Sequence, residues 1–217
     1  MVQKEITKQR GRPRAYDPDK ALTDAQDAFW KKGYSATSLD ELSAATGMNR
    51  PSLYGAFGDK HAIYLKTLER YVEAARHAMH EELDVSRPLE TGLRRVYERA
   101  LSIYFSGNDG ARGCFMIGTA ATEAVTDAEI RSILSEGLRE LDRIFEARLR
   151  HAQTQGELDA AADPVMLAAI ASGIFHTLAV RARAGFTRAS LQELAYAAIR
   201  LMMSHNCLRP DTSNPSA

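Results

Sequence analysis

The chain has 217 residues, of which 45% are hydrophobic and 26% are charged. These fractions are close to the averages of soluble globular proteins and exclude a wholly disordered chain. An uninterrupted run of about 18 apolar residues is missing and the first residues are polar, so we expect no transmembrane helix, no secretory signal and a cytoplasmic location. The two cysteines, Cys114 and Cys207, cannot build a disulfide framework or complete a usual zinc site.

Charge is distributed unevenly along the chain. The 28 basic and 28 acidic side chains cancel, but residues 1–14 carry five basic side chains and one carboxylate, a net +4 that leaves −4 for the remainder. The position of positive charge matters more for nucleic-acid binding than its total. A basic arm on a mildly acidic body is therefore compatible with DNA binding.

Helical periodicity recurs from end to end and β-hairpin signals are almost absent, so we predict an all-α fold of about nine helices. A first helix begins after Asp17-Pro18, a capping residue followed by proline, and closes at Gly33. Two short helices follow, and a long one from about Asp59 carries an apolar stripe at spacings of 3 and 4, formed by Leu65, Leu68, Val72, Ala75, Met79 and Leu83. The later helices are expected up to about 105 and at about 115–124, 127–152, 163–184 and 188–205.

The two short helices have the pattern of a helix-turn-helix. Leu42 precedes Gly47 by five positions and Leu53 follows it by six, so one apolar anchor from each helix meets the other across the turn. No acidic residue interrupts residues 49–58, which allows the second helix to enter a major groove without repelling phosphates. The alternative is an ordinary helical hairpin with a solvated face.

An extended segment of arginines around Gly11 and Pro13 precedes this hairpin and suits a narrow, AT-rich minor groove. Arg50 is expected to read a base and Ser52 a base edge or a phosphate, while Tyr54, Lys60 and Thr37 are expected to hold phosphates. The full set of predicted DNA contacts is Arg10, Arg12, Arg14, Thr37, Ser38, Asn49, Arg50, Pro51, Ser52, Tyr54, Gly55 and Lys60.

Residues 18–64 resemble the DNA-binding domain of TetR-family transcriptional regulators. The resemblance rests on Phe29, Gly33-Tyr34 and Thr37, and on the segment Leu53-Tyr54-Gly55-Ala56-Phe57-Gly58-Asp59-Lys60; Pro51 departs from the small residue that the family often has. It implies a homodimer that binds a palindromic operator, and the following domains: a basic arm at 1–16, a helix-turn-helix domain at 17–62, an effector-binding and dimerisation domain at 63–208 and a tail at 209–217. The function it implies is a ligand-responsive repressor.

The last two long helices are expected to form the dimer interface, because residues 165–175 are apolar nearly all round; the alternative is internal helices of a monomer. A hydrophobic or aromatic effector is expected within the bundle. The candidate pocket residues are Phe105, Phe115, Met116, Phe145, Phe175 and His176, and they are equally compatible with plain core.

Cys114 follows Arg112-Gly113 at a helix start, where a thiol pKa is expected to be lowered, as in redox-sensing or electrophile-sensing regulators; the alternative is a small buried residue. His77, His80 and Glu81 share a helix face, but no further ligand stands nearby, so we predict no metal or cofactor. Without a nucleophile elbow, a phosphate loop or a His-Glu-x-x-His motif, an enzyme is not expected. An architectural minor-groove binder that uses the arginine arm remains the other alternative.

Overall fold

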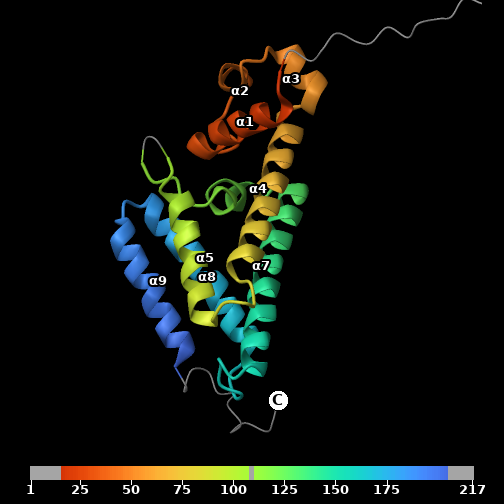
Figure 1. The fold of residues 1–217 in the computed structure, drawn as a ribbon. Coiled ribbons are helices and arrows are strands. Elements are labelled where there is room, and N and C mark those ends of the chain that lie inside the picture. The colour runs from red at the N-terminus through yellow and green to blue at the C-terminus, as the bar shows by residue number, and fades with distance from the viewer. Residues whose placement is uncertain (1–15, 108–109, 205–217) are drawn as a thin grey trace, which may run out of the picture.

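The computed structural model describes residues 16–107 and 110–204, and all regular elements in these ranges are helical (Figure 1). The helices in chain order are α1 (Pro18–Lys32), α2 (Leu39–Thr46), α3 (Arg50–Phe57), α4 (Lys60–Glu82), α5 (Leu89–Tyr104), the π-helix η1 (Met116–Ala120), α6 (Ala121–Glu123), α7 (Ala128–Thr154), α8 (Pro164–Arg183) and α9 (Arg188–Met203). The expected all-α fold is confirmed. Helices α1 to α3 form a head at one end, and α5 to α9 form a body below it.

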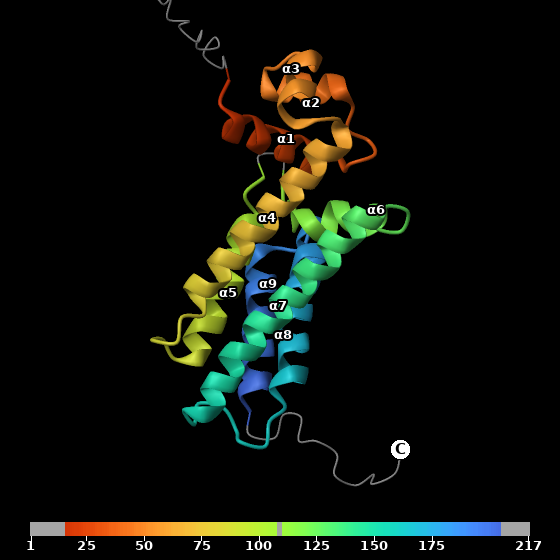
Figure 2. The ribbon, with the colours of Figure 1, turned by 90° about the vertical axis from the view of Figure 1, so that its right-hand side faces the viewer.

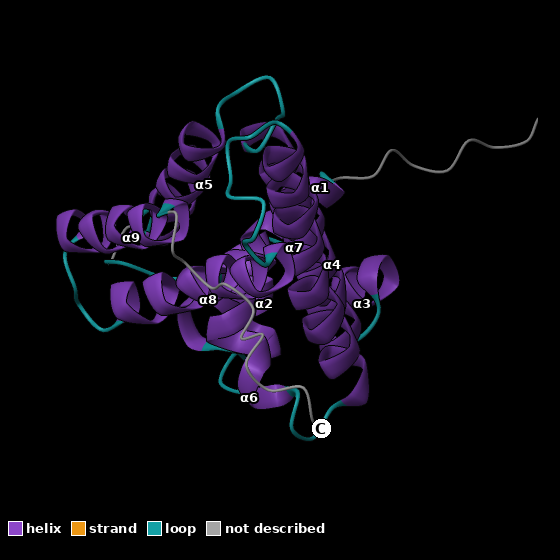
Figure 3. Ribbon diagram, turned by 90° about the horizontal axis from the view of Figure 1, so that it is seen from below, coloured by secondary structure: helices purple, strands orange, loops and turns teal. Residues whose placement is uncertain are grey.

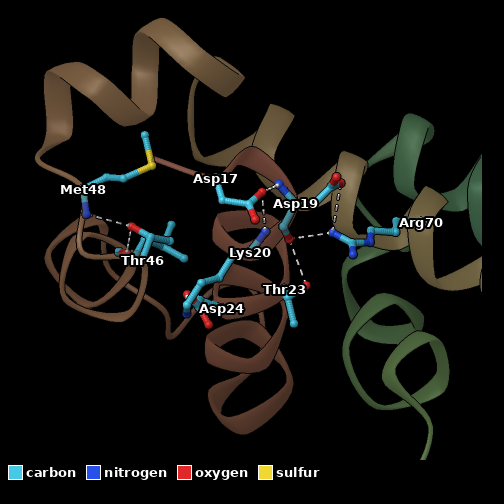
Figure 4. Close-up of polar contacts among 9 residues, drawn as sticks. Asp17, Asp19, Lys20, Thr23, Asp24, Thr46, Met48 and Arg70 are labelled. Atoms are coloured by element: carbon cyan, nitrogen blue, oxygen red, sulfur yellow. Dashed lines mark hydrogen bonds and ion pairs between the residues drawn. The ribbon is translucent and has the colours of Figure 1, made fainter. Parts of the chain in front are cut away.

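The start of α1 is fixed by its cap. The Asp17 carboxylate accepts hydrogen bonds from the backbone amides of Asp19 and Lys20 at 3.0 and 3.4 Å (Figure 4). This satisfies amides that have no partner within the helix. Arg70 of α4 donates to the carbonyl oxygen of Asp19 at 2.8 Å and so joins α4 to the start of α1.

Local signals also fix the turn between α2 and α3. Ser38 and Glu41 form a capping box at the start of α2, and Gly47 ends that helix with φ 66°, a left-handed conformation that glycine adopts without strain. The side chain of Asn49 then caps α3 by accepting from the amide of Ser52 at 2.9 Å. Each helix of the pair therefore begins and ends where its own sequence dictates.

The hydrophobic core has two parts that meet along α4. One part is formed by side chains of α1, α2, α3 and α4 and also includes Phe115 and Ile130. The other part fills the body. Tyr71, Ile103 and Leu134 pack against both parts. Figure 2 shows α4 running from the head down along α7, so this helix is the main connection between head and body.

The buried face of α4 differs from the predicted stripe in its first half. Ile63, Tyr64 and Leu68 are fully buried there, whereas Leu65, the predicted first member, is only half-buried. The first turns pack on α1 and the later turns, including Met79, pack on the body, so the buried face changes along the helix. A single stripe does not describe a helix that serves two cores.

The segment expected as a regular helix at 115–124 is instead a π-helix, η1, followed by one turn of α6. Its packing explains the wider turn. A Cβ on Gly118 would lie 2.6 Å from Nη1 of Arg183, and one on Gly113 would lie 2.7 Å from the carbonyl oxygen of Ala179. The segment is thus pressed closely against α8. Such π-helical turns occur frequently at functional sites.

Helix α8 has the length and composition of a membrane span, but 44% of its apolar window is buried within this fold. It packs against α7 on one side and α9 on another, with α9 on the side of the body opposite α4 (Figure 3). Its outer face remains apolar, with Val165, Met166 and Val180 each at least half exposed, and Leu201 of α9 is 65% exposed. Within residues 16–107 and 110–204, no other part of the fold covers these four side chains.

Candidate nucleic-acid interface

Helix α3 lies at the tip of the head (Figure 1). Leu53 and Phe57 are buried in the head core, and this fixes the rotation of the helix. The residues left exposed by that rotation are Arg50, Pro51, Ser52, Tyr54 and Gly55. The structure therefore brings five of the predicted contacts together on a surface that carries no carboxylate of its own.

Arg50 is held by a carboxylate of the preceding helix. Its Nε and Nη2 donate to Oδ1 of Asp40 at 3.0 and 2.6 Å, and both side chains are exposed. The hydrogen bonds that Arg50 donates to Asp40 raise the pKa of Arg50 above its usual value. Asp40 therefore holds the guanidinium in place at the start of α3. Because a guanidinium has five N–H groups, Arg50 keeps donors that are not used by Asp40.

Three further predicted contacts take part in interactions within the protein. Asn49 caps α3, and Ser38 takes part in the capping box of α2. Lys60 lies with Nζ 4.5 Å from the centroid of the Tyr34 ring and donates to the carbonyl oxygen of Ser35 at 3.4 Å. Partial burial lowers the pKa of Lys60.

The Thr37 hydroxyl does not face outward as expected. It is 1% exposed and donates to the carbonyl oxygen of Gly33 at 2.6 Å, so it closes the turn after α1 and is not available to a phosphate. Arg10, Arg12 and Arg14 lie outside the described residues.

Two sets of polar contacts join the head to the body. In the first, the Arg112 guanidinium lies 3.8 Å from the centroid of the Trp30 ring and pairs with Asp27 at 2.8 Å, while Nε1 of Trp30 donates to the carbonyl oxygen of Arg112. In the second, Ser35 donates to Glu123 at 2.7 Å, and Nε2 of His61 lies 2.8 Å from Oδ2 of Asp127. Sequence patterns did not indicate these pairs, because the two residues of each pair are 66 to 88 positions apart in the chain.

A cavity of about 100 Å³ lies between α4, α5, α7, α8 and the start of η1. Its wall is mostly apolar, and Tyr71 and Ile103, which also pack on the head core, are part of it. Of the predicted pocket residues, Met116, Phe175 and His176 line it. Sequence reasoning missed the contribution of α4, which supplies Tyr71, Val72, Ala75, Arg76, Ala78, Met79 and Glu82.

The remaining pocket candidates do not line this cavity. Phe115 points to the head, where its ring centroid is 5.3 Å from that of Trp30. Phe145 is fully buried between Tyr97 and Phe175, and Phe105 packs at the edge of the body core. The three are core residues because their helices turn them away from the void.

The expectation of a lowered pKa at Cys114 is wrong. The side chain is buried, and this burial raises the pKa of the thiol. Arg112, whose charge was expected to favour the thiolate, instead lies over Trp30. Tyr71 donates to Sγ of Cys114 at 3.3 Å. Among the described residues, no three His, Cys, Asp or Glu side chains come together as metal ligands, and His77, His80 and Glu81 form no such group.

The chain matches two family models. Residues 21–67 match "Bacterial regulatory proteins, tetR family", and residues 90–205 match "Tetracyclin repressor-like, C-terminal domain". The HTH-type transcriptional repressor ComR of Escherichia coli K12 is 32% identical over 201 residues, which cover 90% of this chain and 93% of ComR. BdcR, another transcriptional repressor of this organism, is 35% identical over 117 residues, 54% of this chain and 59% of BdcR.

Solved structures agree with this assignment. A cysteine mutant of the TetR-family regulator CifR, complexed with 26bp operator DNA, is 31% identical with a TM-score of 0.74 over 87% of this chain and 98% of CifR. The reduced form of NemR from Escherichia coli, at 18% identity and a TM-score of 0.76 over 88% of this chain and 98% of NemR, supports the fold alone. The chain belongs to the TetR family of bacterial regulatory proteins and is a DNA-binding transcriptional regulator.

Proposed function

We propose that the chain is a ligand-responsive repressor that binds a palindromic operator as a homodimer. The observation that carries this proposal is the exposed, carboxylate-free face of α3 at the tip of the head, with Arg50 and Tyr54 on it. Phosphate contacts position such a helix and base-edge contacts give it specificity. Its relatives ComR and BdcR are named as repressors, and a CifR structure contains operator DNA. We propose a cytoplasmic location and no catalytic role.

The homodimer would form through the outer face of α8 and α9. Val165, Ala169, Gly173 and Val180 lie along this face at helical spacings, and charged side chains are absent between residues 164 and 180. An exposed apolar patch with a polar rim is typical of protein interfaces. Gly173 sits in the middle of α8 with open space around its Cα, which suits the close approach of a second helix.

An effector would act from the cavity through α4. Tyr71 lines the cavity, and its ring is 5.3 Å from that of Trp30 in the head. A ligand that favours one position of α4 therefore favours one position of the head. Two heads must fit successive major grooves, about one helical turn apart, so a change in their separation releases the operator.

Enrichment of fragments from the genome that encodes the chain tests this proposal. The immobilised full chain is expected to recover a few discrete fragments, and a protein without residues 1–14 should recover the same fragments with lower yield. Broad recovery of AT-rich fragments that disappears on deletion of residues 1–14 would support the architectural alternative and contradict our proposal.

Arg50→Ala is expected to weaken operator binding about ten- to hundredfold, since a bidentate arginine contact to a base is lost. Asp40→Asn should tighten binding, because it releases Arg50 and removes a negative charge next to the DNA. Fluorescence anisotropy of a labelled operator measures both changes. Arg150→Ala removes a similarly paired, exposed arginine of α7 and serves as the control. Unchanged affinity in Arg50→Ala would exclude a DNA contact by this side chain.

The alternative function, sensing of oxidants or electrophiles through Cys114, requires a reactive thiol with a lowered pKa. With its pKa raised by burial, Cys114 is expected to react with iodoacetamide at pH 7 at least about tenfold more slowly than a free cysteine. The measurement uses intact mass in a Cys207→Ser background, with the denatured protein as the positive control. Rapid labelling of the native protein would favour the sensing alternative.

A further inference from the structure

One end of the cavity holds polar groups that the protein itself does not satisfy. Tyr104 is 4% exposed and lines the cavity, and its hydroxyl makes no hydrogen bond within residues 16–107 and 110–204. The Tyr71 hydroxyl, which lies on the same wall, already donates to the sulfur of Cys114 at 3.3 Å. A side chain as buried as Tyr104 normally has a partner for its hydroxyl, so Tyr104 indicates a missing acceptor.

These groups are hydrogen-bond donors at neutral pH. Burial raises the pKa of Tyr71, of Tyr104 and of the Cys114 thiol, and all three residues line the cavity. On α8, burial lowers the pKa of His176, whose Nε2 is buried without a partner. The polar end of the cavity is therefore uncharged.

Charged side chains stand at the edge of the cavity, and their signs cancel. Arg76 is paired with Glu73, Glu82 with Arg95, and Glu140 with Arg143; Arg99 is exposed to solvent. The lining thus holds two arginines and two glutamates, Arg76, Arg99, Glu82 and Glu140. No excess of charge favours an ionic ligand.

The volume limits the size of the ligand. The cavity has about 100 Å³, and a dry cavity of about 150 Å³ accepts benzene. The flexible side chains of Met79 and Met116 form part of the wall and allow a modest expansion. A ligand of about one ring therefore fits only with that expansion, and a larger one is excluded.

Resting on the effector role proposed above, we propose that the cavity binds a small uncharged carbonyl compound of about one ring. Its carbonyl oxygen accepts a hydrogen bond from the hydroxyl of Tyr104, and its apolar body lies among the side chains of α4, α7 and α8.

Three probes of similar shape test this class of ligand: acetophenone has the carbonyl, ethylbenzene lacks it and benzoate carries a charge. Trp30 is the one tryptophan of the chain and lies 5.3 Å from the Tyr71 ring, so its fluorescence reports binding. Acetophenone is expected to bind about tenfold more tightly than either other probe. Tyr104→Phe should reduce this preference over ethylbenzene to about threefold or less, whereas Tyr16→Phe, a change in the head, should leave it unaltered.

Equal binding of ethylbenzene, preference for benzoate, no binding of the three probes, or an unchanged preference in Tyr104→Phe would each overturn the ligand assignment. Release of operator DNA is measured separately. If acetophenone binds with the expected selectivity and leaves the DNA complex intact, the ligand class stands and the effector role fails. If the chain shows no sequence-specific DNA binding while the selectivity holds, the proposed repressor function fails and the cavity assignment stands.

Discussion

Gly55→Glu is expected to lower operator affinity by at least about 100-fold while the protein stays folded and dimeric. Gly55 is exposed on α3, and an added Cβ meets nothing within 4 Å, so the fold has room for the new side chain. The carboxylate would stand in the middle of the exposed face of α3, a helix that has no carboxylate of its own, where it repels phosphates and blocks close approach to the groove. Helix propensity favours glutamate over glycine, which leaves the free energy of unfolding unchanged or slightly higher.

Ala74→Glu provides the matched control for this variant. Ala74 is exposed on α4, away from α3, and the substitution changes the net charge of the chain by the same amount. Anisotropy with a labelled operator and thermal unfolding are measured for both variants. Retained affinity in Gly55→Glu, or an equal loss in Ala74→Glu, would contradict the assignment of α3 as the reading helix.

Gly173→Glu is expected to convert the dimer to a folded monomer and to reduce operator affinity by at least about 100-fold, because one head then binds without its partner. The position has open space within the protomer, so the protomer itself should not be destabilised. Burial of a charge in an apolar interface costs free energy, and in a symmetric dimer both copies carry the new glutamate. The free-energy cost of dimerisation therefore counts twice.

Sedimentation velocity measures the oligomeric state of this variant, with Ala74→Glu again as the control. Val165→Glu, near the start of the same exposed face, is expected to weaken the dimer less, since it lies farther from the centre of α8. A Gly173→Glu protein that remains dimeric would show that another face joins the two copies.

The connection between head and body depends on a few identifiable side chains. Tyr71 packs on Trp30, Arg112 lies over the same Trp30 ring system and pairs with Asp27, and the loop that carries Arg112 leads directly to Cys114 at the cavity. Contiguous packing therefore joins the cavity to α1. The proposed control of DNA affinity by a ligand depends on such a connection.

The head was predictable because its signals are local. Asp17-Pro18 predicted the start of α1 and Gly33 its end, and the structure agrees with both. The capping box of Ser38 with Glu41 and the Asn49 cap are equally local, although only the structure revealed them. The exposed residues of α3 follow from the burial of two apolar side chains on an eight-residue helix.

The cavity was not predictable, because a void depends on the packing of several helices at once. Periodicity gives the buried face of each helix, but it does not distinguish a side chain that fills the core from one that lines an opening. Phe145 and Phe175 are neighbouring aromatic residues of the body core, the first fully and the second partly buried, yet only the second borders the cavity. The π-helical turn of η1 likewise follows from contacts with α8, such as that at Gly118, and not from its own sequence.

Selection of bound duplexes from a random DNA library, with purified full-length protein at physiological salt, tests the central claim most directly. Two copies that each place α3 in a major groove should recover a palindromic motif with half-sites about one helical turn apart. Recovery of AT-rich DNA without a palindrome, or no enrichment at all, would contradict sequence-specific recognition by a dimer.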